Sequence, residues 1–153
     1  MKPGLWNSVI KAKYFPSLPV HLWIRSTPDC PNQGSLIWKQ LSKTLPIILQ
    51  WISWNPGNGQ QIEVGRDYIL GLGSRALLSA PLLTHLHSRN LFYLYQFISP
   101  INGGLLGNHW LSGEELQLKA DLHNEWSGYT QLLMAAGICL QDRPDFLMWT
   151  GGD

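Results

Sequence analysis

Histidines and cysteines are the residues best suited to hold a metal ion, and their spacing argues against such a site. His85 and His87 form the closest pair, but the surrounding pattern is helical, and residues two apart on a helix point to different sides. Cys30 and Cys139 lie far apart in the sequence. A tetrahedral zinc site needs several converging ligands, so we predict no bound metal and no cofactor.

The acidic residues do not form a catalytic pattern. A polymerase needs paired aspartates to hold two metal ions, and the sequence contains no Asp-Asp pair. Glu114 and Glu115 have the position of first-turn helix acids, and Asp67 follows a predicted strand, where it would stabilise a turn. No G-x-S-x-G motif is present either. The sequence therefore predicts a protein that is not an enzyme.

Two glycine-rich stretches could suggest phosphate binding. Gly57-Asn58-Gly59 and Gly71-Leu72-Gly73 do not continue into a G-K-[ST] or G-x-G-x-x-G pattern. Glycines in such short runs are typical of turns, and we interpret both stretches as turns.

Basic residues are concentrated in the first third of the chain. Residues 1–50 hold six Lys or Arg against one Asp, a net charge of +5, whereas residues 51–153 hold five bases against nine acids. A solvated helix face is the simpler interpretation. The alternative is attraction to a phosphate backbone, for which the candidate contacts are Lys11, Lys13, Arg25, Lys39 and Lys43.

The eight tryptophans are many for a chain of 153 residues. Trp54, Trp126 and Trp149 fall on predicted apolar faces, as do Trp6 and Trp38, so packing is the leading interpretation. The alternative is stacking on the bases of a single-stranded nucleic acid. Trp23 and Trp110 would be the candidates, because both fall in predicted loops.

Composition limits the class of protein further. Charged residues make up 14% of the chain, against roughly 25% in ordinary domains, so part of the surface is expected to be covered by a partner or by a longer protein. No segment reaches the roughly 18 consecutive apolar residues of a membrane span. We predict an intracellular protein without membrane contact, with the nucleus as one candidate compartment.

Apolar periodicity predicts mainly helices. A helix is predicted at 5–14, followed by an extended, proline-rich connection at 16–34. A second helix begins near Ser35 and is interrupted by Pro46. Further along, Ser79 would cap a helix, and 91–98 favours a helix with a strand as the alternative. Ser112 to Glu115 has the form of a capping box, and the helix that it opens carries Leu118, Leu122 and Trp126 on one face. A separate last helix covers 127–136 and ends at Gly137.

The strands are fewer. Alternation on both sides of Asn55-Pro56-Gly57-Asn58-Gly59 predicts a β-hairpin near 51–65, and Phe146 to Trp149 predicts the beginning of another strand near 146–149. The fold class is therefore α+β, mainly α-helical. The loop at 100–104 is the predicted boundary between a first part, 1–100, and a second part, 101–153.

Five segments resemble, in order and spacing, the region that follows the reverse transcriptase in plant LINE-type (non-LTR) retrotransposon polyproteins. There a W-x-x-G-N-G-x-x-I segment precedes helices and then a D-x-L-x-W strand that opens a zinc-binding reverse transcriptase module. The segments here are Trp6 with Lys13-Tyr14, Gly34 to Lys39, Trp54 to Gly59 with Ile62 and Asp67, Leu78-Ser79, and Asp145 to Asp153. They extend over nearly the whole chain.

The differences from that family limit what the resemblance implies. The catalytic Y/F-x-D-D hairpin lies upstream in the family and the zinc ligands lie downstream, and neither is present here; Arg66 stands where many members have Trp. No family catalytic or metal-binding residue carries over. The resemblance implies a non-catalytic fragment of an RNA-directed DNA polymerase polyprotein. In it, 1–100 is a connecting region that helps position RNA or DNA, and 101–153 leads into a truncated zinc-binding module. The alternative is a stand-alone nucleic-acid-binding module that uses its basic first third.

Overall fold

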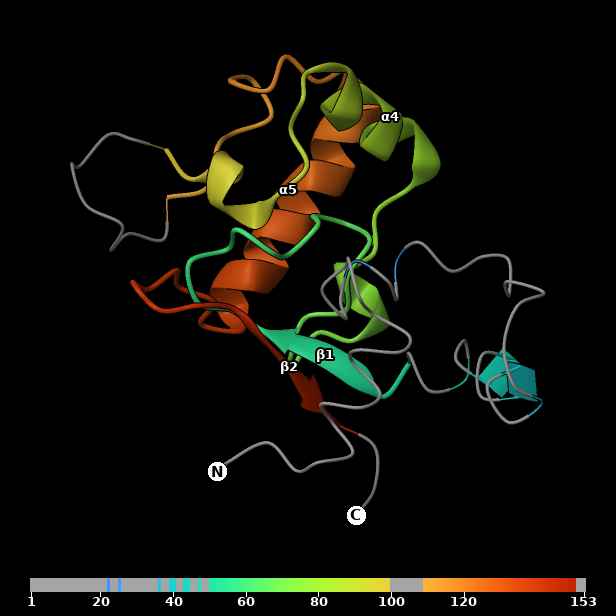
Figure 1. Ribbon diagram of the computed structural model, residues 1–153. Coiled ribbons are helices and arrows are strands. Elements are labelled where there is room, and N and C mark those ends of the chain that lie inside the picture. The colour runs from blue at the N-terminus through green and yellow to red at the C-terminus, as the bar shows by residue number, and fades with distance from the viewer. Residues whose placement is uncertain are drawn as a thin grey trace. The chain divides into compact units, whose positions relative to one another are not determined.

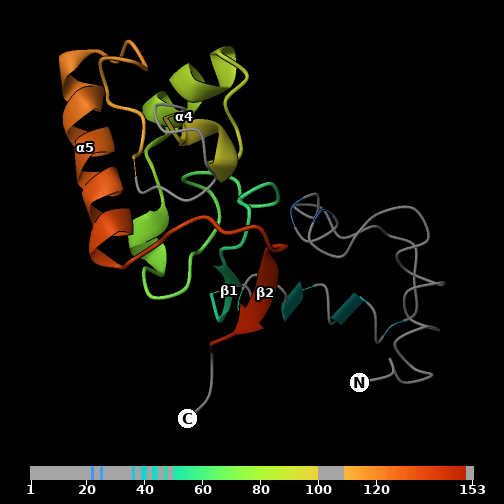
Figure 2. The same cartoon turned by 90° about the vertical axis from the view of Figure 1, so that its left-hand side faces the viewer.

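The computed structural model describes residues 50–99 and 109–150, together with eight separate positions between Leu22 and Ile47. The chain forms two compact units, Met1–Leu45 and Pro46–Asp153. The second contains nearly all of the described residues, and its elements are drawn in Figures 1 and 2.

The second unit combines helices with a small antiparallel sheet, which confirms the α+β class. Strand β1 (Ile52–Asn55) is followed by the 3-10 turn η1 (Ser74–Ala76), helix α4 (Ala80–Ser88) and the 3-10 turn η2 (Leu94–Phe97). Helix α5 (Ala120–Ala135) and strand β2 (Phe146–Trp149) complete the described elements. In both views α4 lies beside one end of α5, and the two strands lie beyond the other end (Figures 1 and 2).

The predicted strand near 146–149 is confirmed, but the predicted β-hairpin at 51–65 is wrong. β1 pairs with β2, not with residues 61–64, in the antiparallel register that places Ile52 opposite Trp149 and Asn55 opposite Phe146. Just beyond the strands, Thr150 donates from its amide and its hydroxyl to the carbonyl oxygen of Trp51, at 2.7 and 2.9 Å. The sheet therefore joins segments more than 90 positions apart in the sequence.

Residues 61–64 pair elsewhere because the loop before them does not make a tight turn. The amide of Leu94 donates to the carbonyl of Ile62 at 2.9 Å, and the amide of Val64 donates to the carbonyl of Phe92 at 2.9 Å. The segment is thus held by the chain around η2. Alternating residues identify a strand-like segment, but they carry no information on its partner.

The long helix α5 replaces two predicted helices. The capping box forms as predicted: the Ser112 amide donates to the Glu115 carboxylate at 2.7 Å, and the Glu115 amide donates to the Ser112 hydroxyl at 3.2 Å. The capping box closes only one turn, because Gln117 has a positive φ of 51°, which a right-handed helix cannot contain. α5 then continues through the expected break near residue 127 and ends before Gly137, whose φ is +65°.

Helix α4 begins where the sequence predicted, with Ser79 as its N-cap. The Ser79 side chain does not cap the helix itself. Its hydroxyl donates to one oxygen of Glu125 at 2.7 Å, and its amide donates to the other at 2.6 Å. Because Glu125 lies on α5, this pair connects the start of α4 to the first half of α5. The segment 91–98, expected to be a helix or a strand, forms the short turn η2, with isolated β-bridges at Tyr93 and Ile98 on either side of it.

One hydrophobic core holds both described stretches together. Its largest fully buried side chains include Trp126, Phe97, Ile62, Leu82 and Leu140. The Trp126 indole N–H donates to the carbonyl of Leu111 at 2.7 Å. The centroid of the Phe97 ring lies 5.0 Å from that of the Trp126 ring. Residues 50–99 and 109–150 therefore share their core, although the predicted boundary at 100–104 itself lies outside the described residues.

Much of the prediction for the first unit lies outside the described residues, including the helix at 5–14. The separate positions from Leu36 to Ile47 have helical conformation, as predicted for that segment. Leu22 and Arg25 are also helical, so the extended connection predicted at 16–34 is wrong at these two positions. The eight residues between Pro19 and Pro28 contain no proline, which permits helical turns there.

Candidate functional site: the Asp145 clamp

A buried carboxylate organises the glycine-rich loop after β1. Asp145 is only 5% exposed. Its Oδ1 accepts hydrogen bonds from the amides of Gly57 at 2.7 Å and Gly59 at 2.9 Å, and its Oδ2 accepts one from the amide of Gln61 at 2.8 Å. We call Asp145 and these three amides the Asp145 clamp.

The types of residue in the loop explain why the clamp can form. Pro56 stops β1 from continuing, since it has no amide to donate. Gly59 adopts a positive φ of 74°, a conformation that glycine reaches without steric cost. Alternate amides at 57, 59 and 61 then point to one place, and such a converging set of N–H groups favours an anionic oxygen.

The chain before Asp145 contacts the same loop a second time. The Arg143 guanidinium donates to the side-chain oxygen of Asn55 at 3.0 Å and to the carbonyl of Pro56 at 2.9 Å. The amide of Gln141 donates to the carbonyl of Gly57 at 2.8 Å. The two segments approach so closely that a Cβ on Gly57 would lie 2.2 Å from the carbonyl oxygen of Arg143, so no larger residue fits without a backbone shift.

The clamp fixes the positions of backbone groups. Both oxygens of Asp145 already accept bonds from backbone amides, and a carboxylate so bonded is stabilised in its position. No nucleophilic side chain is hydrogen-bonded to it among residues 50–99 and 109–150. Its effect is to fix the start of β2 against the end of β1.

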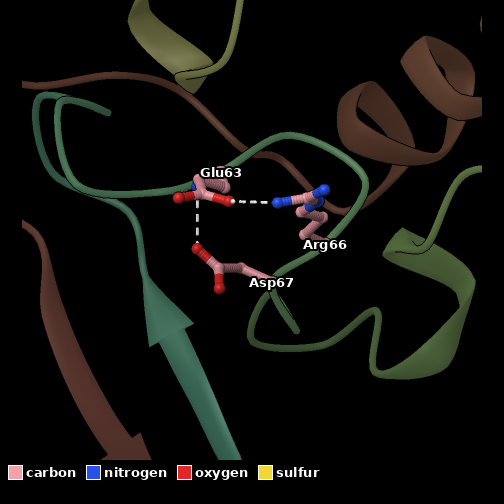
Figure 3. A network of polar contacts seen from close by, with 3 residues as sticks. All are labelled: Glu63, Arg66 and Asp67. Carbon is pink, nitrogen blue, oxygen red and sulfur yellow. Dashed lines mark hydrogen bonds and ion pairs between the residues drawn. The ribbon is translucent and has the colours of Figure 1, made fainter. Parts of the chain in front are cut away.

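A second acidic group stabilises the next turn, as predicted for Asp67. Its Oδ2 accepts a hydrogen bond from the amide of Glu63 at 2.7 Å (Figure 3). The amides of Arg66 and Asp67 both donate to the carbonyl of Glu63. The Arg66 guanidinium lies 3.6 Å from the Glu63 carboxylate, but its side chain is 58% exposed, so this ion pair adds little.

Among the described residues, Tyr129 has the most clearly shifted pKa. Burial raises the pKa of its hydroxyl, the nearby Gly65 backbone lowers it, and the negative charge of Asp67 raises it further. The hydroxyl lies near Gly65 without the geometry of a full hydrogen bond. Tyr129 therefore stays neutral, as a core residue of α5 packed against Trp126.

The predicted phosphate contacts lie outside the continuously described ranges of the chain. Lys11 and Lys13 lie outside the described residues, and Arg25, Lys39 and Lys43 are described only as separate helical positions. Of the two tryptophans proposed for base stacking, Trp23 is outside the described part, and Trp110 is half-buried. The exposed indoles of the described part are Trp51, at 42%, and Trp149, at 57%, so Trp149 lies outside the core.

Asp145 and Arg143 were missed as interacting residues. The resemblance singled out the segments that contain Gly57, Gly59 and Asp145, but it did not indicate that they touch. Within the described ranges, no three His, Cys, Asp or Glu side chains are arranged to hold a metal ion. Nor does any helix in those ranges have the length and apolar character needed to cross a membrane.

Comparison with known proteins gives no match to a family model, to a curated sequence or to a solved structure.

Proposed function

We propose that this chain is a non-catalytic connecting segment of a LINE-type retrotransposon reverse-transcriptase polyprotein, and that it helps position RNA or DNA. One observation carries the proposal. The two most recognisable segments of the resemblance, Trp54 to Gly59 and Asp145 to Trp149, are joined through the Asp145 clamp. A shared ancestor that needed both segments for one contact would retain them in that order.

The clamp also suggests where the connecting region ends. The last four residues of the D-x-L-x-W segment form β2, which completes a sheet with the upstream strand β1. In the proposed polyprotein, the connecting region would therefore include β2, and the zinc-binding module would begin after it. The rest of the polyprotein is then the natural partner of this chain.

The proposed contacts to nucleic acid are the basic residues of the first third. They would bind phosphates, so affinity should fall steeply with salt, with a slope near 0.7 to 0.9 per neutralised phosphate. The test is fluorescence anisotropy with labelled single-stranded RNA and an RNA–DNA duplex over a salt series. Absence of binding to either at low salt would contradict the proposed function.

A matched pair of variants makes that test specific. The first changes Lys11, Lys13, Lys39 and Lys43 to Gln. The control changes Arg66, Arg75, Arg89 and Lys119 to Gln, four exposed bases of the second unit with the same loss of charge. The first set should weaken binding about tenfold or more and flatten the salt slope, whereas the control should retain most of both. Equal losses in the two sets would mean unspecific attraction by net charge.

The stand-alone nucleic-acid-binding module remains the second candidate, and the shared core of residues 50–99 and 109–150 favours it. A urea titration followed by tryptophan fluorescence and near-UV circular dichroism separates the two. Coincident, cooperative transitions are expected of a self-sufficient domain. A gradual change without near-UV signal would mean that the chain needs its polyprotein neighbours to fold.

A further inference from the structure

The outer edge of β2 has backbone groups without a described partner. The amide of Thr150 donates toward β1, to the carbonyl of Trp51. Backbone groups alternate between the two edges of a strand, so those of Phe146 and Met148 also face β1, whereas those of Leu147 and Trp149 face outward. Among residues 50–99 and 109–150, no backbone hydrogen bond reaches these two residues from the outer side.

The outer side of β1 is partly covered by the chain. The amide of Trp54 donates to the carbonyl of Tyr68, and the amide of Leu70 donates to the carbonyl of Trp54, both at 2.8 Å. Its far side is thus covered at Trp54 by the chain that follows. Ile52 has no described backbone partner on that side, so within the described ranges the longer open edge of this sheet belongs to β2.

The β2 edge also lacks the features that normally protect an edge strand. Such strands usually carry a charge, a proline or a bulge, but Phe146-Leu147-Met148-Trp149 has none of these. Phe146 is 44% exposed and Trp149 is 57% exposed. A sheet of two strands is marginal in water and gains stability from a third.

We propose that this edge pairs with the same edge of a second copy of the chain. The two β2 strands would run antiparallel about a two-fold axis beside Met148. Leu147 of each copy would then exchange backbone hydrogen bonds with Trp149 of the other, and the outward groups of both copies would all find partners. The product is a four-stranded sheet in the order β1, β2, β2, β1.

The absence of charge on β2 favours a second copy of the chain over a nucleic acid as its partner. β2 contains neither Lys nor Arg to meet a phosphate. The Arg143 guanidinium lies 5.4 Å from the Phe146 ring and donates to Asn55 and Pro56. Because β2 is uncharged, pairing it with itself brings no like charges together.

The available area predicts a weak dimer. Large aromatic side chains bury roughly 200 Å² each, and Phe146 and Trp149 are about half exposed, so they add roughly 200 Å² per copy. Stable interfaces bury roughly 1,200 Å² or more in total. We therefore expect a dimer that dissociates on dilution, with a dissociation constant of about 10 µM or higher.

Sedimentation velocity of the full chain tests the pairing, over a range from about 5 to about 500 µM. Met148→Lys and Met148→Glu each place like charges face to face across the axis, where opposite residues of a non-hydrogen-bonded pair are closest. Each variant alone should be monomeric, and an equimolar mixture of the two should dimerise. Met134→Lys is the control, because Met134 is a 48% exposed methionine that lies on α5 and not on β2.

Several outcomes would overturn the proposal. These are a wild-type chain that stays monomeric throughout, single-charge variants that dimerise like the wild type, and a mixture that is not rescued. A chain whose sedimentation changes only when single-stranded RNA is added, and whose Met148→Glu variant loses that change, would instead assign the edge to nucleic acid.

A second pair of variants covers the case in which a charge at 148 disturbs folding, as judged by near-UV circular dichroism. Trp149→Pro removes an outward amide without touching the bonds to β1, and Trp149→Ala retains that amide. Dissociation should be stronger in the proline variant, by about tenfold in the dissociation constant. Equal effects in the two variants would count against strand pairing.

Discussion

The Oδ1 atom of Asp145 lies 2.7 Å from the amide nitrogen of Gly57, a residue 88 positions earlier in the chain. This contact turns a glycine-rich loop into a fixed structure and places the start of β2 against the end of β1. The same aspartate also holds Gly59 and Gln61. Stability of the second unit should therefore depend on this single side chain.

Asp145→Asn should lower the free energy of unfolding by about 3 kcal/mol. The amide group can keep one acceptor oxygen, but its NH₂ would then face the Gln61 amide, donor against donor. Urea unfolding followed by tryptophan fluorescence measures the change. Asp142→Asn is the control, since Asp142 is exposed, and its effect should stay within about 0.5 kcal/mol. Similar effects of the two substitutions would contradict the role of the clamp.

Gly57→Ala should be destabilising by more than about 2 kcal/mol. The new Cβ would meet the carbonyl oxygens of Arg143 and Pro144 at 2.2 and 2.4 Å, which are backbone atoms that cannot turn aside. Gly128→Ala is the matched control within α5, where a Cβ meets no atom within 4 Å. It should stabilise by about 0.5–1 kcal/mol, because alanine favours the helix. A neutral Gly57→Ala in thermal unfolding would mean that the segments lie further apart.

Glu125→Ala should be destabilising by about 1 kcal/mol, because the Ser79 amide at the start of α4 loses its acceptor. Glu114→Ala provides a comparison at an exposed acid, with an expected change within about 0.5 kcal/mol. Thermal unfolding at neutral pH compares the two variants. If they cannot be distinguished, the contact between Ser79 and Glu125 does not persist in solution.

Tyr129 should make the protein sensitive to alkaline pH. Its folded-state pKa is raised above the ordinary value of 10.0, mainly by burial. Below that pH both states hold the proton and the residue adds no pH dependence. Above it the unfolded chain loses the proton while the folded chain retains it, so stability falls as pH rises. Tyr129→Phe should remove this part of the alkaline loss, as measured by urea unfolding at several pH values from about 8 to 11.

Local patterns in the sequence predicted local structure well. The capping box at Ser112 and Glu115 formed, Gly137 follows the end of a helix, and Phe146 to Trp149 form a strand. Each of these depends on residues a few positions apart. The break near residue 127 was wrong because the apolar face of α5 continues through Trp126, Tyr129 and Leu133.

Contacts between distant segments could not be predicted in the same way. Asn58-Gly59 favours a hairpin turn when considered alone, but the carboxylate of Asp145 draws the amides on both sides of it into a wider loop. Alternation at 52–54 and 61–64 was compatible with that hairpin and gave no means to identify β2 as the partner. For Asp145 the sequence offered only its place in a recognisable segment.

Amide hydrogen exchange at Gly57, Gly59 and Gln61 is the measurement that tests the clamp most directly. In the wild-type chain these three amides should exchange at least about tenfold more slowly than that of Gly71, an exposed loop glycine. In Asp145→Asn the protection of Gln61 should be lost first, while that of Trp126 in α5 is affected least. If the three amides exchange as fast as Gly71 in the wild-type chain, Asp145 does not hold the loop, and the link between the two segments of the resemblance fails with it.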